Sequence, residues 1–207
     1  MKESEASVFF GTFSILTISP DSKLMGVAVA SGSPSVGDRV PHAKPGIGVV
    51  ATQAHTNIIY GVKGLELMTQ GLSPQQTLDK LLREDSESKL RQVAIMDFKG
   101  RTAVFTGALV SGHHAEFVGR TCVALGNMLS TREVIDRIVE KFENTNGDLA
   151  LRLADALKVG SESGGDRRGE ISAALTVVSS EKTIVKIKVD VHANPVRELR
   201  NKLKFQR

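Results

Sequence analysis

The order of the apolar segments is the feature that most restricts how this chain can fold. Segments rich in β-branched and aromatic residues, which are typical of strands, alternate with segments whose apolar residues recur at helical spacing. The sequence runs strands, two helices, strands, two helices, strands, helix. A doubly wound parallel sheet needs a helix after nearly every strand, so this order argues against it. It favours an α+β fold with two stacked, mainly antiparallel sheets and helices on the outside.

The strands are expected over residues 8–18, 24–30, 47–54, 91–97, 102–106, 117–125, 171–178 and 183–191. Ser73 and Ser130 are each expected to cap a helix, because a serine hydroxyl accepts a hydrogen bond from the first helical turn. Glu133, three residues after Ser130, would complete a capping box. Further helices are expected over residues 149–159 and from Pro195 onward. The apolar positions expected under the outer helices are Leu65, Leu78, Leu81, Val134, Ile138 and Leu153.

Length and composition favour one soluble domain over residues 1–207. The single cysteine, Cys122, excludes an intrachain disulfide, and its apolar neighbours predict a buried, unreactive thiol. No apolar run approaches the roughly 18 residues of a membrane helix. The segment Met1–Gly11 carries Glu3 and Glu5, which is unlike a signal peptide, so we expect a cytoplasmic protein.

The charge distribution argues against a nucleic-acid-binding protein. The formal net charge is +4, aromatic residues make up 4%, and much of the positive excess lies in the last eleven residues. Nucleic-acid surfaces usually combine a basic patch with aromatic side chains on which bases stack. We therefore expect no nucleic-acid partner.

A series of short motifs follows in a specific order: TFSI at 12–15, GVAVAS at 26–31, GVVATQA at 48–54, RQVAIMDFKG at 91–100, GNML at 126–129 and GGDRRG at 164–169. Together they closely resemble the family filed as domain of unknown function 1028, which is considered similar to the N-terminal-nucleophile (Ntn) hydrolases. The resemblance covers the chain from Thr12 nearly to its C-terminus. It implies a four-layer α/β/β/α sandwich and names no substrate.

The resemblance also implies that the mature chain begins at Thr12, so that residues 1–11 are a propeptide or an N-terminal extension. A terminal threonine can act as a nucleophile because its own α-amine serves as the base. Self-processing relatives cut a Gly-Thr junction, as found here at Gly11–Thr12. The local sequence alone favours an ordinary β-branched strand residue at Thr12.

Two charged residues, Lys44 and Asp166, have roles implied by proteasome-like relatives. Lys44 would lower the pKa of the nucleophile, and a solvated loop lysine is its alternative. Asp166 would support the terminal amine. The neighbouring Arg167 or Arg168 could clamp a carboxylate, because an arginine side chain matches a carboxylate in geometry and charge. The alternative for this loop is a helix-to-strand turn that contains an Asp–Arg pair.

Two amides flank the end of the strand over residues 47–54. Gln53 and Asn57 are candidates to bind substrate or to donate to an oxyanion, and turn formation is the alternative for Asn57. We expect Thr12, Lys44, Asn57 and Asp166 to converge on one cleft.

No metal or cofactor is expected. The adjacent His113 and His114 point to opposite sides of a strand, and the other histidines have no ligand spacing. The leading hypothesis is an amide hydrolase with Thr12 as nucleophile and an unidentified small-molecule or peptide substrate. The alternative is a non-catalytic protein that keeps the fold to bind a small ligand or to assemble.

A homo-oligomer, most simply a dimer, is expected from the apolar residues near both chain ends. They are Val196, Leu199, Leu203 and Phe205 in the terminal helix and the run Val8-Phe9-Phe10.

Overall fold

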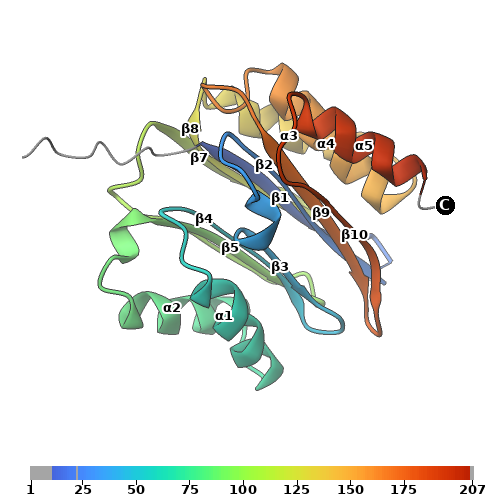
Figure 1. Cartoon of the computed structure of the whole chain (residues 1–207). Helices are drawn as coiled ribbons and strands as arrows, with labels where there is room; N and C mark the ends of the chain where they lie inside the picture. Colours follow the sequence, from blue (N-terminus) through green and yellow to red (C-terminus); the bar gives the residue numbers. More distant parts are fainter. Residues whose placement is uncertain (1–10, 22, 206–207) are drawn as a thin grey trace, which may run out of the picture.

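The computed structural model describes residues 11–21 and 23–205. Two antiparallel sheets lie face to face, and helices cover the outer side of each sheet (Figure 1). The larger sheet has the strand order β10-β9-β2-β1-β8-β7. Its strands are β1 (Thr12–Ile18), β2 (Leu24–Ser31), β7 (His113–Val118), β8 (Cys122–Leu129), β9 (Ser172–Ser179) and β10 (Thr183–Val189).

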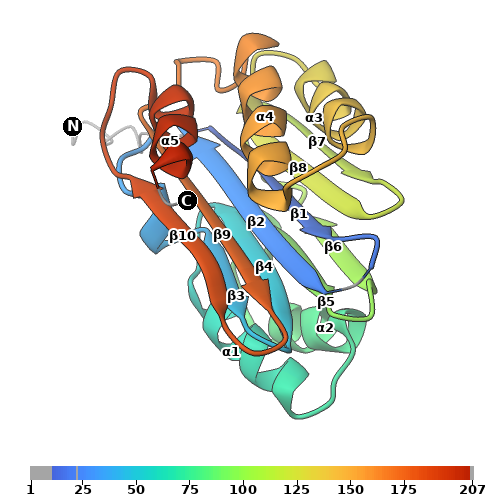
Figure 2. The same ribbon diagram turned by 90° about the vertical axis from the view of Figure 1, so that its right-hand side faces the viewer.

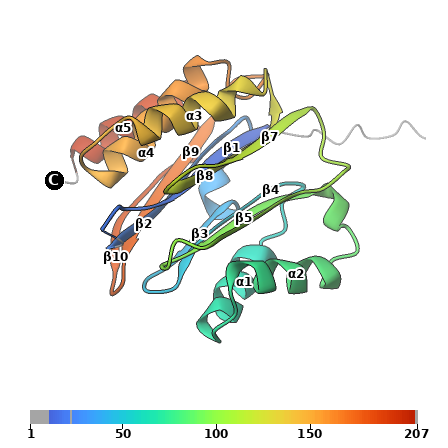
Figure 3. The same cartoon turned by 180° about the vertical axis from the view of Figure 1, so that it is seen from behind.

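The smaller sheet has the order β3-β4-β5-β6 and stacks against the larger one, as Figure 3 shows from behind. Its strands are β3 (Pro41–Lys44), β4 (Gly48–Ala54), β5 (Arg91–Asp97) and β6 (Thr102–Thr106). Two short 3₁₀ helices, η1 (Val36–Asp38) and η2 (Ser88–Leu90), lie in the connections.

The five α-helices form the two outer layers. Helices α1 (Ile59–Thr69) and α2 (Pro74–Glu84) cover the smaller sheet (Figure 1). Helices α3 (Glu133–Glu143), α4 (Leu149–Glu162) and α5 (Pro195–Lys204) lie over the larger one (Figure 2). The predicted four-layer α/β/β/α sandwich is confirmed. None of the helices in the described part of the chain is long and apolar enough to span a membrane.

Three apolar cores separate the four layers, and the alternation of side chains along β1 explains two of them. Phe13 and Ile15 point into the core under α3, α4 and α5, whereas Leu16 and Ile18 point into the core between the sheets. A third core joins the smaller sheet to α1 and α2. All six side chains predicted to lie under the outer helices are buried: Leu65, Leu78, Leu81, Val134, Ile138 and Leu153.

One of the two predicted helix caps is confirmed. The Ser73 hydroxyl accepts a hydrogen bond from the Gln76 N–H, and Gln76 Oε1 accepts one from the Ser73 N–H. The Ser130 cap is wrong: α3 has Arg132 before its first residue and no side-chain cap. Ser130 is instead held by the loop after α4, because its N–H donates to the Gly165 carbonyl.

Two strand predictions need correction. The stretch 117–125 is not one strand, because a turn at residues 119–121 separates β7 from β8 and the Gly119 N–H donates to the Cys122 carbonyl. Strand β3 lies between the predicted strands over 24–30 and 47–54, where no strand was predicted; it is short and begins at Pro41, which cannot donate to a ladder. The first strand was expected from residue 8, and residues 8–10 lie outside the described part.

The apolar face of α5 packs on its own chain. Val196, Leu199 and Leu203 belong to the core beneath α3, α4 and α5, while Phe205 is exposed. This helix therefore does not supply the apolar surface from which a dimer was expected. The Val8-Phe9-Phe10 run lies outside the described residues, and the homo-oligomer stays a prediction.

Candidate active site

A pocket of about 500 Å³ opens where β1 begins and β4 ends. Thr12 lies in its wall, with a side chain on the face of β1 that looks toward the smaller sheet. The other lining residues come from both sheets and their loops: Ser33, Arg39, Val40, Ala54, His55, Thr56, Ile58, Leu90, Leu109, Val110, Ser111, Asn127 and Met128. The pocket thus combines a buried hydroxyl, a guanidinium and a mainly aliphatic wall.

The pairing of β1 with β2 sets Thr12 directly opposite Ser31. Their hydroxyl oxygens lie 2.9 Å apart. Ser31 Oγ also donates a hydrogen bond of 2.8 Å to the Gly11 carbonyl oxygen. Because a serine hydroxyl has one proton, Thr12 must be the donor of the bond to Ser31. The Thr12 proton therefore points toward an oxygen that already contacts the Gly11 carbonyl.

The Gly11 carbonyl oxygen accepts a second hydrogen bond, from the Gly32 N–H at 3.2 Å. This bond continues the β1–β2 ladder by one residue beyond Thr12 and Ser31. Two donors thus converge on the carbonyl that precedes the candidate nucleophile. Such a pair polarises a carbonyl and stabilises negative charge that develops on its oxygen.

Asp166 lies on the other side of Gly11. Its side chain is buried, and its carboxylate accepts hydrogen bonds from the Gly32 N–H (2.9 Å) and the Arg168 N–H (3.0 Å). The carboxylate lies so close to the Gly11 α-carbon that a β-carbon at Gly11 would be 2.6 Å from Asp166 Cγ. Asp166 is therefore next to the peptide bond between Gly11 and Thr12.

Hydrogen bonds to Glu170 fix the loop that carries Asp166. One Glu170 carboxylate oxygen accepts from the Asp166 N–H at 2.8 Å, and the other accepts from the Ser161 hydroxyl at 2.6 Å. Gly165, in the left-handed region at φ 45°, lets the chain turn just before Asp166. These contacts hold the carboxylate in place.

Arg39 supplies the guanidinium in the pocket. Its Nη2 donates to Ser33 Oγ and to the Pro34 carbonyl, the latter at 2.9 Å. Ser33 Oγ lies 3.3 Å from Ser31 Oγ, so polar contacts connect Arg39 to Thr12 through two serines. Burial lowers the pKa of the Arg39 guanidinium.

A buried group of amides supports the strand of Thr12 from the smaller sheet. Gln53 Nε2 donates to the Thr12 carbonyl (3.3 Å) and to Gln92 Oε1 (2.8 Å). Gln53 Oε1 accepts from the Ser14 hydroxyl at 2.6 Å, and Asn127 Nδ2 donates to Gln92 Oε1 at 3.2 Å. Gln53 is fully buried, so its amide positions β1 and does not face the pocket.

Two residues in the pocket wall have a backbone conformation that non-glycine residues rarely adopt. Ala54 has φ 67° and Met128 has φ 48°. Ala54 is the last residue of β4 and Met128 is the last but one of β8, so both lie where a strand ends at the pocket. Such strained positions gather at functional sites more often than elsewhere.

The structure does not bring Lys44 to Thr12. Lys44 pairs with Gly48 at the start of β4, whereas the pocket lies at Ala54, its other end. Six residues of strand separate these ends by roughly 20 Å. The Lys44 ammonium instead donates to Thr69 Oγ1 of α1 at 3.0 Å. The expected convergence therefore fails for Lys44, because β3 runs back along β4 and carries it away.

Asn57 and Arg167 make contacts other than those predicted for them. Asn57 Oδ1 accepts from the Ile59 N–H at 3.0 Å, which is the turn-forming alternative at the start of α1. Arg167 is exposed, and its N–H donates to the Met128 carbonyl. The arginine whose guanidinium approaches Asp166 is Arg168, with its Nε 3.6 Å from the carboxylate.

Sequence reasoning missed Ser31, Ser33, Arg39, Gln92 and Asn127. The sequence did contain a signal for Ser31. If the two strands pair antiparallel around the turn after Pro20–Asp21, the residue opposite Thr12 is Ser31. No comparable signal marks Arg39, which reaches the pocket from a loop. Among the described residues, no group of three or more histidine, cysteine, aspartate or glutamate side chains is arranged to hold a metal ion.

Comparison with known proteins gives a matching family and a number of similar solved structures, two of which are described below. The model of a family described as "Family of unknown function (DUF1028)" matches residues 12–199. The crystal structure of protein SPO2555 from Silicibacter pomeroyi, described by the same family model, has a TM-score of 0.88 and 28% identity. That match covers 94% of this chain and 88% of the other.

A second solved structure is Anbu (ancestral beta-subunit) from Yersinia bercovieri. It has a TM-score of 0.46 and 9% identity, with 94% of this chain and 93% of the other covered. No curated protein matches the chain.

Proposed function

The chain belongs to the DUF1028 family, and from the geometry around Thr12 we propose that it is an Ntn-type hydrolase that cuts its own Gly11–Thr12 bond. The mature protein would then hydrolyse an amide with Thr12 as nucleophile. The observation that carries this proposal is the pair of donors on the Gly11 carbonyl, one of which also contacts the Thr12 hydroxyl.

Self-cleavage would proceed by an N-to-O acyl shift. The Thr12 oxygen attacks the Gly11 carbonyl carbon, and Ser31 Oγ and the Gly32 N–H stabilise the negative charge on the carbonyl oxygen. The C–N bond then breaks. The Thr12 hydroxyl gives up its proton to Ser31, and the leaving amine takes up a proton in return. Water hydrolyses the resulting ester, which releases residues 1–11 and restores the hydroxyl.

The same residues would serve the mature enzyme. The new α-amine of Thr12 has an ordinary pKa of about 7.7 to 8.0 and can act as the general base. Asp166, which contacts Gly11 in the uncut chain, would orient this amine. The substrate carbonyl would take the place of the Gly11 carbonyl, next to the Gly32 N–H and Ser31. No step needs a cofactor.

The second candidate is a binding protein that keeps the peptide bond intact. It is favoured by the same Gly32–Gly11 hydrogen bond, because that bond extends an ordinary antiparallel ladder past Thr12. The pocket beside Thr12 would then hold a small ligand without chemistry.

Intact-mass measurement separates the two candidates. Wild-type protein should lose residues 1–11 over time, Thr12→Ser should also cut, and Thr12→Ala should stay full length. The cut forms should then be screened against a library of small amides, with Thr12→Ala as the inactive control. Wild-type protein that keeps its full mass after prolonged incubation would contradict the hydrolase and favour the binding protein.

A further inference from the structure

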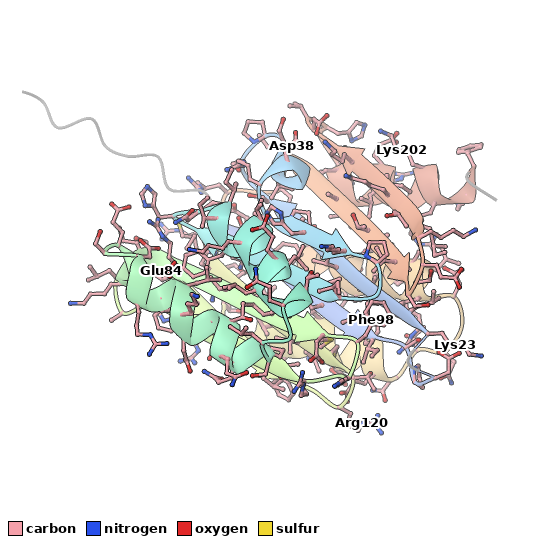
Figure 4. All side chains as sticks on the ribbon, turned by 90° about the horizontal axis from the view of Figure 1, so that it is seen from below. Lys23, Asp38, Glu84, Phe98, Arg120 and Lys202 are labelled. Atoms are coloured by element: carbon pink, nitrogen blue, oxygen red, sulfur yellow. The ribbon has the colours of Figure 1, made fainter. Side chains whose placement is uncertain are left out.

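Arg39 has unused hydrogen-bonding capacity inside the pocket. Its Nη2 contacts Ser33 and Pro34, but its Nε and Nη1 groups have no hydrogen-bond partner among residues 11–21 and 23–205. Within the same residues, no carboxylate forms an ion pair with Arg39. The adjacent Asp38 lies on η1, beside β9 and β10 (Figure 4). It forms an ion pair with Lys188 instead.

The Asp38 carboxylate attracts the partly buried Arg39 guanidinium without forming an ion pair with it, and burial still lowers the pKa of Arg39. Removing a charge from water costs free energy that a paired anion and its hydrogen bonds can offset. The Nε and Nη1 groups lie on opposite edges of the guanidinium, so each can donate singly to a carboxylate, and such charge-assisted hydrogen bonds strengthen where water is excluded. The free donors of Arg39 are thus suited to a carboxylate brought by a ligand.

The rest of the pocket wall indicates which chemical group the remainder of that ligand would carry. Its apolar lining residues are Val40, Ile58, Leu90, Leu109, Val110 and Met128. A volume of about 500 Å³ is in the range of small-molecule sites and too small for a folded partner. A compact aliphatic group would bury against these side chains.

We infer that the substrate of this site is a small amide that carries both a carboxylate and an aliphatic group, such as an N-acyl amino acid or a short peptide. Arg39 would hold the carboxylate, and the serine contacts that join Arg39 to Thr12 would place the amide at the nucleophile. This inference rests on the proposed function, whose substrate class it names.

The test is a binding measurement that needs no turnover. Full-length Thr12→Ala protein keeps the Gly11 carbonyl in the place of the substrate carbonyl, but the pocket lined by Arg39 is present in this uncut chain. It is titrated with N-acetyl-leucine and with N-acetyl-leucinamide, which have the same shape and differ in the carboxylate. We expect the carboxylate to bind at least about tenfold more tightly, since a charge-assisted hydrogen bond is roughly twice as strong as a neutral one and a tenfold preference corresponds to about 1.4 kcal/mol. Adding Arg39→Met should remove that preference, and adding Arg39→Lys should restore part of it.

Arg137 supplies the matched control. It is an exposed arginine of α3 that pairs with Glu140, far from Thr12 in the fold, so Arg137→Met should leave the preference unchanged. Equal binding of the two probes, binding of neither at millimolar concentration, or an undiminished preference in folded Arg39→Met would each overturn the inference. Thermal unfolding of each variant reports whether it is folded.

The two proposals fail differently. Selective carboxylate binding by a protein that never cuts itself would support the Arg39 site while contradicting the hydrolase. Self-cleavage together with equal hydrolysis of charged and neutral amides would support the hydrolase while contradicting the role given to Arg39.

Discussion

The carboxylate of Asp166 packs directly on the α-carbon of Gly11, leaving no room for a side chain at that position. We predict that Gly11→Ala will destabilise the full-length protein by about 1 to 3 kcal/mol, because the added methyl must displace Asp166. The shift would also disturb the Gly32 N–H, which contacts both Asp166 and the Gly11 carbonyl. Urea unfolding measures the first effect, and intact mass should show slower self-cleavage.

Gly64→Ala is the control for this substitution. A β-carbon at Gly64 would make ordinary contacts, the nearest being 3.6 Å from Leu81 Cδ1 within the α1–α2 layer. It should leave self-cleavage at the wild-type rate and should not lower stability, since alanine is favoured over glycine within a helix by up to about 1 kcal/mol. If Gly11→Ala behaves in the same way, Asp166 is not held against Gly11 as described.

The Ser31 hydroxyl provides one of the two donors on the Gly11 carbonyl. Ser31→Ala should slow self-cleavage about a hundredfold, since loss of one oxyanion donor typically costs a factor of 100 to 1,000. The time course of the intact mass measures the rate. Ser179→Ala, at the other end of the large sheet and in a turn with Lys182, should cut at the wild-type rate. Equal rates for the two variants would contradict a role for Ser31.

The layer order could be predicted from the sequence because it depends on patterns that are local. Paired helical segments between groups of strands, together with the family motifs, were enough to give the four-layer sandwich. The Ser73 cap and the buried leucines of α2 follow from spacing within one helix. The predicted Ser130 cap was wrong because Ser130 contacts a loop that is distant in sequence. Its N–H donates to the Gly165 carbonyl, and α3 begins only after Arg132.

The site was harder to predict, because its residues meet only through tertiary contacts. Thr12 and Asp166 were found through the family motifs, and the structure brings both to Gly11. Lys44 was proposed because proteasome-like relatives have a lysine in a similar place in the chain, and the β3–β4 hairpin takes it to the far end of the sheet. Arg39, which does reach the pocket, lies in a loop where no periodic pattern applies.

Cys122 should be unreactive in the folded protein. It is 1% exposed, and burial raises the pKa of its thiol to about 12. Since the thiolate is the reactive form, modification by a disulfide reagent at pH 8 should be at least about a hundredfold slower than in denaturant. Absorbance of the released thiol reports both rates. Fast, stoichiometric labelling without denaturant would contradict the buried position of Cys122 in β8.

Asp85 gives a prediction on pH dependence. Its carboxylate accepts from Arg91 Nε at 2.8 Å, from the Glu87 N–H at 3.0 Å and from the Tyr60 hydroxyl at 3.0 Å. The hydrogen bond from Arg91 contributes most to holding the Asp85 pKa at about 2, below its ordinary value of 3.8. A lowered folded-state pKa means that the ionised carboxylate stabilises the protein fully above about pH 4 to 5. This stabilisation is lost as the pH falls through about 4 toward 2.

Asp85→Asn should therefore lower the free energy of unfolding at pH 7 by on the order of 2 kcal/mol, and this deficit should shrink as the pH falls from about 4 to 2. Urea unfolding at a series of pH values gives both quantities. Asp136→Asn, at an exposed position of α3, should show little deficit at any pH. A deficit for Asp85→Asn that stays constant down to pH 2 would mean that the substitution acts through packing, and that ionisation of Asp85 contributes nothing to stability.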